Sequence, residues 1–387
     1  MATTTAPLRD QTRLLAMSLA HFLNDGYVNY LPGVLPVLLS NLHIPLALVG
    51  SLVLVLQLTS FLQPLSGILA DRFGGKAFAL GGLALNAIAA ALVGIAPNYG
   101  TLLLLLLLAS LGSTLFHPQA LAGARTLSQR AHGTGMSIFL VGGELGRGVW
   151  PVLAGLLVVA LGLKGLLLLA IPGLLAVVGL ARFLPSLPPQ PSAGSPLRHV
   201  WRSSVLLLIL YVGIRSLIAA GVSTFVPLIW HQAGGSLVGG ASLVSVMLVI
   251  GILGNLAGGW LSDRWGRRPV LVASGVLSAL SLIAYLEATG IALWLSLAVL
   301  GIAVFCTAPV TMLIGQDLFP ENRSLGSGIA LGVGSALGAV GVLLLGLIAA
   351  WLGLLAPVRL LIVMALISTP LAWWLTASSG APSQLSR

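Results

Sequence analysis

The sequence predicts an all-α integral membrane protein with twelve transmembrane helices, arranged as two pseudo-symmetric halves of six helices each. Three observations support this fold class: the scarcity of charge, the placement of the basic residues between the apolar runs, and an internal repeat. Only 7% of the 387 residues are charged and 58% are hydrophobic, whereas soluble domains carry about 25% charged residues. A soluble fold of this size would not have enough charged residues to cover its surface.

Long apolar runs supply the membrane spans. A span needs about 20 apolar residues to cross a hydrocarbon core of about 30 Å, and its backbone must satisfy its own hydrogen bonds, which favours helices. A membrane β-barrel would instead show segments of alternating polarity, which we do not find. The predicted spans lie near residues 14–40, 47–70, 77–96, 101–124, 134–160, 163–184, 203–230, 237–262, 269–288, 291–316, 325–351 and 356–377.

The basic residues fix the expected orientation of these spans. With a cytoplasmic N-terminus, fourteen of the eighteen Lys and Arg residues lie on the cytoplasmic side: Arg9, Arg13, Arg72, Lys76, Arg125, Arg130, Arg182, Arg198, Arg202, Arg264, Arg267, Arg268, Arg323 and Arg387. Lys164 and Arg359 lie outside, and Arg147 and Arg215 lie within spans. By the positive-inside rule we expect an even number of spans and both termini in the cytoplasm. The membrane we expect is a bacterial cytoplasmic membrane.

A proline-rich segment and a repeat divide the chain. Residues 185–200 contain five prolines and cannot form a regular helix, so we expect a first half at 1–184, a cytoplasmic linker at 185–201 and a second half at 202–387. A loop motif recurs at an offset of 192 residues: Gly67, Asp71, Arg72, Gly74 and Lys76 correspond to Gly259, Asp263, Arg264, Gly266 and Arg268, with Arg267 beside the last. The same offset relates Gly142 to Gly334 and Gly146 to Gly338. Two parallel repeats of six helices are one known transporter architecture.

The repeated loop resembles the signature between helices 2 and 3 of the major facilitator superfamily. Further segments resemble its fosmidomycin-resistance, drug:proton antiporter branch: residues 21–25 with Leu-Pro pairs at 31–32 and 35–36, residues 112–118, residues 137–143 and residues 316–320. The resemblance covers essentially the whole chain and implies proton-driven export of a drug or metabolite by alternating access. It implies no cofactor, because the proton gradient supplies the energy. Glu144 and Arg147 depart from the small or uncharged residues expected in helix 5, and Gly75 replaces a basic residue of the loop.

The resemblance also assigns gating or structural roles to the loop and glycine motifs. Asp71 and Asp263 would contact the N-terminus of a helix in the opposite half, where the helix dipole favours a carboxylate. Asp317 belongs to the motif at 316–320. Gly142, Gly143 and Gly146, with Pro151, resemble the helix-5 motif of antiporters, and simple close packing of helices explains the same glycines equally well.

Four charges are predicted to lie deep within spans: Asp25, Glu144, Arg147 and Arg215. Each costs at least about 2.5–3.5 kcal/mol at the centre of a helix, so a functional role is the default hypothesis. Asp25 is the strongest candidate for proton coupling, because His21 lies one turn before it and Asn29 one turn after it on one polar face. A permanent hydrogen bond to a neighbouring helix is the alternative.

The other intramembrane charges leave two interpretations open. Glu144 and Arg147, three residues apart, form either an internal ion pair or a site where Arg147 holds an anionic substrate group and Glu144 takes a proton. Arg215 has no acidic residue within four positions, so we expect a partner such as Asp25 or Glu144, or a substrate anion.

Helix 4 carries a polar stripe made by Ser110, Ser113, Thr114 and His117. His117 is predicted either to relay protons or to pack as a hydrogen-bonded histidine before a break at Pro118. Weaker candidates for residues that line a substrate cavity are Asn24, Asn29, Gln57, Gln63, Ser113, Tyr211 and Asn255.

Other functions find little support in the sequence. A symporter, a uniporter or a lysolipid flippase on the same scaffold is the alternative to an exporter. An intramembrane enzyme ranks far lower, because no H-E-x-x-H or G-x-S-x-G motif is present, and the absence of a phosphate-binding P-loop argues against a pump that hydrolyses ATP itself. The basic residues form no nucleic-acid-binding patch and Cys306 is the single cysteine. His21 and His117 are too few and too isolated to indicate a metal site. The expected partners are the lipid bilayer, a small-molecule substrate and protons, and we expect a monomer.

Overall fold

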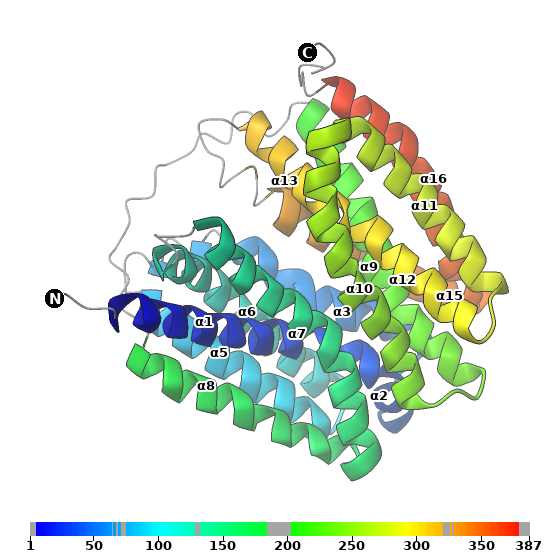
Figure 1. The fold of residues 1–387 in the computed structure, drawn as a ribbon. Coiled ribbons are helices and arrows are strands. Elements are labelled where there is room, and N and C mark those ends of the chain that lie inside the picture. Colours follow the sequence, from blue (N-terminus) through cyan, green and yellow to red (C-terminus); the bar gives the residue numbers. More distant parts are fainter. Residues whose placement is uncertain are drawn as a thin grey trace. The chain divides into compact units, whose positions relative to one another are not determined.

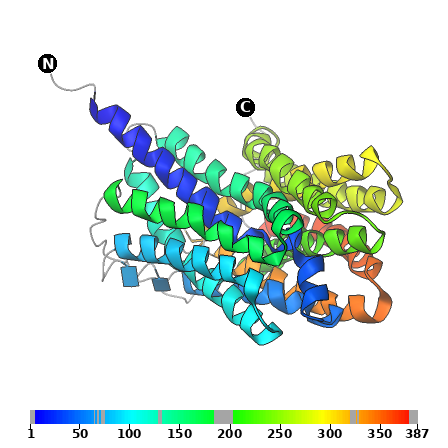
Figure 2. The same ribbon diagram turned by 90° about the horizontal axis from the view of Figure 1, so that it is seen from below.

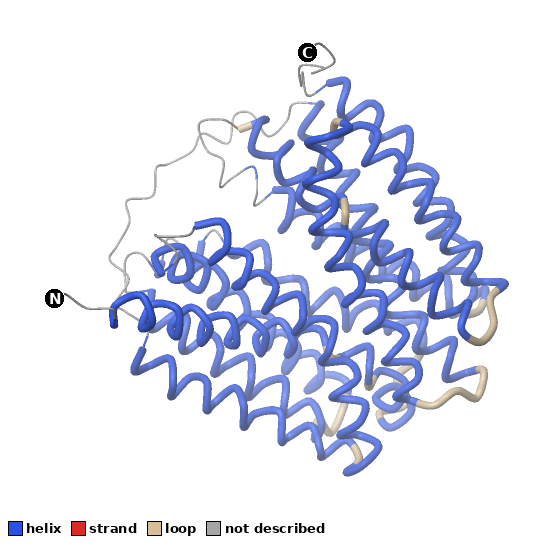
Figure 3. The backbone as a smooth tube through the Cα atoms, in the orientation of Figure 1, coloured by secondary structure: helices blue, strands red, loops and turns tan. Residues whose placement is uncertain are grey.

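The computed structural model describes residues 5–63, 65–66, 69–70, 75–127, 132–183, 203–319, 326 and 329–378. The described residues form helices joined by short turns, with no strand among them (Figure 3). The chain divides into two compact units, one made of residues 1–43 and 58–192 and the other of residues 44–57 and 193–387. Gly67, Asp71, Arg72 and Gly74 of the first loop motif and the predicted linker at 185–201 lie outside the described residues.

The first unit is built around its N-terminal helix, α1. This helix packs against α5, α6, α7 and α8, as two views of the ribbon show (Figures 1 and 2). The helical elements of the unit are α1 (Thr5–Asn29), η1 (Leu31–Gly33), α2 (Leu35–Asn41), η3 (Thr59–Leu62), α5 (Gly75–Leu92), η4 (Val93–Ile95), α6 (Tyr99–Leu127), α7 (His132–Leu161), η5 (Leu163–Leu169) and α8 (Ala170–Phe183). One face of α1, which includes Met17, Ala20 and Asp25, is therefore buried against these helices, whereas Leu15 and Leu19 on another face are exposed.

The second unit has α9 in a comparable position. This helix packs against α10, α13, α15 and α16, while α11 packs against α12 and α16. The elements are η2 (Leu46–Leu48), α3 (Val49–Leu58), α9 (Ser203–Gln232), α10 (Leu237–Trp265), α11 (Arg267–Glu287), α12 (Ile291–Phe305), α13 (Thr307–Leu318), the short π-helix η7 (Ile329–Val333), α15 (Gly334–Leu352) and α16 (Leu355–Ser378). Residues 44–57, predicted to belong to the first half, group here through the contact of η2 with α15.

Ten helices in the described part of the chain are long and apolar enough to cross a membrane. They correspond closely to the third to twelfth predicted spans. The first predicted span, 14–40, is interrupted: α1 ends at Asn29, and η1 and α2 follow. Pro32 and Pro36 explain this break, since proline lacks an N–H group and restricts the residue before it. The second is a shorter apolar helix at Leu46–Leu62, so the count of twelve stays a prediction.

Pro118 does not break helix 4 as the sequence suggested, because α6 continues to Leu127. A proline inside a helix removes the hydrogen bond to the carbonyl group four residues earlier, here that of Thr114. The hydroxyl group of Ser66 donates to this carbonyl oxygen at 2.9 Å. A neighbouring side chain thus replaces the lost backbone donor, and the helix passes through the proline.

Candidate functional site

Asp25 lies near the C-terminal end of α1 and is almost completely buried, with a side chain that is 6% exposed. His21 occupies the preceding turn of the same face, and the distance between its Nε2 atom and Oδ1 of Asp25 is 3.5 Å. The side chain of Asn29 donates instead to the backbone oxygen of Asp25, at 2.8 Å. The helical spacing therefore brings His21 to the carboxylate, as predicted, while Asn29 caps the end of the helix.

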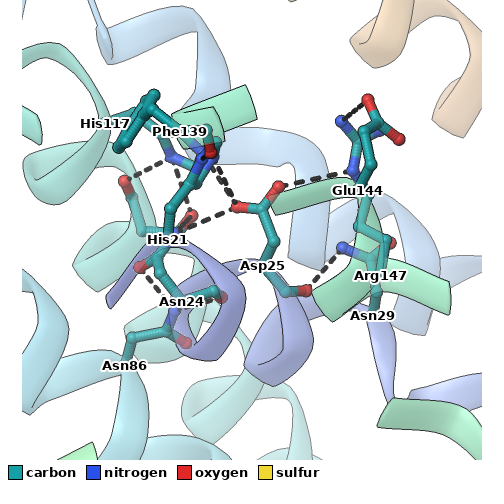
Figure 4. A network of polar contacts seen from close by, with 10 residues as sticks. His21, Asn24, Asp25, Asn29, Asn86, His117, Phe139, Glu144 and Arg147 are labelled. Atoms are coloured by element: carbon teal, nitrogen blue, oxygen red, sulfur yellow. Dashed lines mark hydrogen bonds and ion pairs between the residues drawn. The ribbon is translucent and has the colours of Figure 1, made fainter. Parts of the chain in front are cut away.

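Two other helices complete the surroundings of the carboxylate (Figure 4). His117 of α6 places Nε2 2.9 Å from Oδ1 of Asp25. Arg147 of α7 approaches the other oxygen, Oδ2, with its Nε atom at 3.3 Å. Asp25 thus lies between two histidines on one side and an arginine on the other.

The hydrogen bonds of the two histidines determine where protons can sit. Nδ1 of His21 is 2.9 Å from the backbone oxygen of Phe139, and Nδ1 of His117 is 2.9 Å from that of Ser113. Because a carbonyl oxygen only accepts, each Nδ1 must carry the hydrogen, which leaves Nε2 of a neutral ring as an acceptor. An acceptor facing a carboxylate oxygen at 2.9 Å requires a proton between them. We therefore assign one proton to the pair of Asp25 and His117.

Arg147 connects Asp25 to a second carboxylate. Its Nη2 atom donates to Oε1 of Glu144 at 2.8 Å, while its Nε faces Asp25. With both histidines neutral, the two carboxylates and the single guanidinium give a net charge of −1, which one added proton neutralises. The side chains of Arg147 and His117 are 36% and 29% exposed. The cluster is therefore accessible where these two side chains lie.

Side-chain amide groups form hydrogen bonds next to the buried carboxylate. The Nδ2 atom of Asn24 donates to Oγ of Ser113 at 3.0 Å and lies 3.3 Å from Oδ1 of Asp25. Asn86 of α5 donates to the side-chain oxygen of Asn24 at 2.9 Å. Asn24 and Ser113, predicted to contact substrate, therefore support the buried carboxylate.

Two members of this arrangement were missed by the sequence analysis. Asn86 is a lone amide in an apolar span, a signal that marks it as an intramembrane polar residue. Phe139 is different: its ring stacks on His21 with a centroid distance of 4.2 Å, and its backbone oxygen accepts from the same histidine. No sequence signal identifies a backbone carbonyl as a proton-orienting group.

Glycines allow α7 to approach α1 closely enough for these contacts. A Cβ atom on Gly142 would collide with the backbone of Ser18, one on Gly143 with the ring of His21, and one on Gly146 with the backbone of Phe22. Pro151 lies farther along α7, and a Cβ atom on Gly33 would collide with its backbone. The glycine motif, for which the sequence left gating and close packing open, thus makes close helix contacts in this unit, directly beside the charged cluster.

The polar stripe of helix 4 divides between two neighbours. Ser113 and His117 face α1, whereas Ser110 and Thr114 hydrogen-bond the hydroxyl group of Thr59 in η3, at 2.6 and 2.8 Å. The first pair belongs to the cluster around Asp25, and the second pair joins two helices.

Arg215 of α9 lies in the second unit and is 4% exposed. Among the described residues, its guanidinium donates to neutral acceptors: Oγ of Ser278 at 3.0 Å and the backbone oxygen of Ala303 at 2.7 Å. This differs from the acidic partner that the sequence suggested. Tyr211, predicted to contact substrate, is fully buried and donates to the backbone oxygen of Leu271 at 3.3 Å.

The second copy of the loop motif is described and forms local contacts within its unit. Arg267 donates to Oδ2 of Asp317 at 2.6 Å, and Arg268 donates to Oγ1 of Thr376 at 2.9 Å. Asp263 and Arg264 are exposed. The remaining predicted residues are Gly266, which has a φ of 86° between α10 and α11, Gly259, which has open space around it, Lys76 at the start of α5, and Gln57 in α3. The gating or structural roles of the motif residues, and the substrate contact of Gln57, stay predictions.

His21 and His117 are not isolated in the structure, as the sequence analysis assumed, whereas the absence of a metal site stays a prediction. One donor atom from each of His21, Asp25 and His117 lies within 4.8 Å of the others. The two histidines are 96 positions apart in the sequence and meet only because α6 packs against α1. This tertiary contact is what the sequence analysis lacked.

Comparison with known proteins places the whole chain in context. The family model described as Major Facilitator Superfamily matches residues 17–254 and 216–386. The fosmidomycin resistance protein of Escherichia coli is 28% identical over 359 residues, which cover 86% of this chain and 85% of that protein. An uncharacterized MFS-type transporter of Bacillus subtilis, YfnC, is 26% identical over 88% of this chain and 90% of its own length.

Solved structures agree on the fold. A bacterial homolog of the human lysosomal transporter Spinster, in an inward-facing and unoccupied conformation, superposes with a TM-score of 0.80 over 97% of this chain and 98% of its own, at 16% identity. The nucleoside transporter NupG gives a TM-score of 0.76 over 95% and 98% of the two chains, at 17% identity.

Proposed function

Because the chain belongs to the Major Facilitator Superfamily, we propose that it is a proton-coupled exporter of a small anionic or amphiphilic compound. It is a membrane transporter rather than an enzyme, and it resembles the fosmidomycin-resistance branch. The name of the E. coli relative supports export as the direction of transport. The observation that carries proton coupling is the buried cluster in which Asp25 faces His117, His21 and Arg147.

In this proposal the proton and the substrate compete for Asp25. When the cluster has lost its proton, the ionised carboxylate can accept a hydrogen bond from a donor group of the substrate, while the partly exposed guanidinium of Arg147 holds an anionic group. When a proton returns to the cluster, the charge of Asp25 is neutralised, this hydrogen bond is lost and the substrate is released. Such competition couples one movement to the other in an antiporter.

The proposal includes a location and an assembly state. We propose that the protein spans the bacterial cytoplasmic membrane many times with both termini in the cytoplasm, because fourteen of eighteen basic residues lie on the side assigned to the cytoplasm. Its bacterial relatives support the same membrane. We propose that one chain, working as a monomer, transports protons and substrate and needs no bound cofactor.

Transport in proteoliposomes tests this function. Vesicles that contain the purified protein are loaded with fosmidomycin, and the release of the compound is followed with and without acidification of the side that corresponds to the cell exterior. We expect acidification to accelerate release and a protonophore to remove this acceleration. A rate of release that does not change with the pH gradient would contradict proton coupling and would indicate a uniporter or a flippase. Acceleration by the opposite gradient would indicate a symporter.

A further inference from the structure

We propose that His21, Asp25 and His117 form a binding site for a divalent transition-metal ion of the zinc class, which occupies the position of the shared proton. The three side chains offer two imidazole nitrogens and one carboxylate oxygen, a common ligand set of zinc sites. They come from two helices, α1 and α6, whose packing fixes their separation. The binding itself does not depend on the proposed transport function.

The distances suit a tetrahedral ion. Ligands about 2.0–2.1 Å from a tetrahedral zinc ion lie about 3.3 Å from one another. The Nε2 atoms of His117 and His21 lie 2.9 and 3.5 Å from Oδ1 of Asp25, on either side of this value. All three donor atoms lie within 4.8 Å of one another, a spread that rotation of the side chains can bring to the spacing of zinc ligands.

The second shell of such a site is already in place. A histidine that binds a metal usually donates its other ring nitrogen to a carbonyl or carboxylate, which orients the free lone pair toward the ion. Here Nδ1 of His21 donates to the Phe139 backbone oxygen and Nδ1 of His117 to that of Ser113, both at 2.9 Å. Both Nε2 lone pairs are therefore aimed at the carboxylate oxygen before any ion arrives.

The charges around the site allow a cation to bind there. Arg147 approaches the far oxygen of Asp25 rather than the one that the histidines face, and Glu144 pairs with the same guanidinium. The titratable and charged groups that face Asp25 are thus His21, His117 and Arg147, with Glu144 behind. Together with Asp25 itself, these groups carry a net charge of −1 when the histidines are neutral, so an ion that binds next to Oδ1 meets a negative rather than a positive environment.

The test uses the full-length protein, purified with an affinity tag free of histidine, and titrated with ZnCl₂ in a calorimeter. We expect one saturable site per chain. His21→Gln and His117→Gln should each weaken binding at least about tenfold, on the scale seen for second-shell losses. His231→Gln alters an exposed histidine at the end of α9 and should bind zinc as the wild type does. The absence of a saturable site, or wild-type affinity in the variant that lacks both His21 and His117, would overturn the proposal.

X-ray absorption of the unmodified protein with bound zinc gives a readout that requires no variant to fold. We expect two imidazole ligands and oxygen ligands at about 2.0–2.2 Å. A zinc spectrum without imidazole scattering would overturn the assignment. Because neither measurement involves a gradient or a substrate, the metal site and the transport function succeed or fail separately. If both hold, zinc in place of the proton should slow proton-driven transport.

Discussion

The two units share a pattern of helix packing but not a pattern of charge. Adding the repeat offset of 192 to a residue number in the first unit gives the equivalent position in the second unit. The charged and titratable residues of the cluster have uncharged equivalents: His21 corresponds to Gly213, Asp25 to Leu217, Glu144 to Ala336 and Arg147 to Ala339. The helical scaffold is therefore repeated in the two units, whereas the candidate proton site is present in the first unit alone.

The glycines show the repeated part. Gly146 lets α7 approach the backbone of Phe22 in α1, and its equivalent Gly338 lets α15 approach Ser216 and Leu217 in α9. Each of these helix pairs is extensively packed. Small residues permit such close contact between helices inside a membrane.

Arg215 is the contrasting charge of the second unit. It is buried like Asp25, but its acceptors among the described residues are neutral, and an arginine does not lose its proton in proteins. A group that stays charged can hold an anion or stabilise a helix contact, but it cannot carry a proton. Proton chemistry is therefore expected in the first unit.

The largest effect should follow removal of the carboxylate. Asp25→Asn keeps the size of the side chain but removes its charge, so the proton shared with His117 is lost. We expect proteoliposomes with this variant to lose all acceleration of fosmidomycin release by a pH gradient. Thermal unfolding provides the control for folding. Acceleration equal to that of the wild type would remove Asp25 from the coupling mechanism.

The two intramembrane arginines should differ in substrate selectivity. Arg147→Ala removes a partly exposed guanidinium, so anionic compounds should bind more weakly by about 1.5–3 kcal/mol, the range for hydrogen bonds to charged groups, while neutral compounds change little. Arg215→Ala, whose guanidinium contacts only neutral protein groups among the described residues, should affect both classes alike. Ligand-induced shifts of the melting temperature measure both responses. Equal losses in Arg147→Ala would indicate a structural role for this residue as well.

Packing variants should behave alike in the two units. Gly146→Ala and Gly338→Ala each place a methyl group against a neighbouring backbone, and overpacking of this kind costs about 1–3 kcal/mol. Gly81→Ala is the matched control, since nothing lies within 4 Å of its added Cβ atom. Melting temperatures of detergent-solubilised protein compare them. A loss in only one of the two glycine variants would break the proposed symmetry of packing.

The smallest effect is expected at the ion pair between Arg267 and Asp317. The side chain of Asp317 is 54% exposed, and exposed ion pairs contribute about 0.2–1 kcal/mol. Asp317→Ala should therefore lower the melting temperature only slightly, and added salt should reduce the difference from the wild type. A large loss of transport with unchanged stability would instead favour the gating role that the loop motif suggests.

The helices could largely be predicted from the sequence because apolar run length and the distribution of basic residues are local properties. The interruption after Asn29 was missed, although Pro32 and Pro36 signal it. On α1, helical spacing was enough to place His21 beside Asp25. The approach of His117, Arg147 and Asn86 to α1 depends on which faces of α5, α6 and α7 pack together, and hydropathy does not encode that choice.

The central claim is that the proton which drives transport is held by Asp25 and its neighbours in the first unit. The most direct test adds fosmidomycin to the purified protein in a weakly buffered solution and measures the change in pH. We expect the wild type to release protons as the substrate binds to the ionised Asp25, and Asp25→Asn to release none. Equal release from both proteins would place the coupling proton elsewhere and contradict the account.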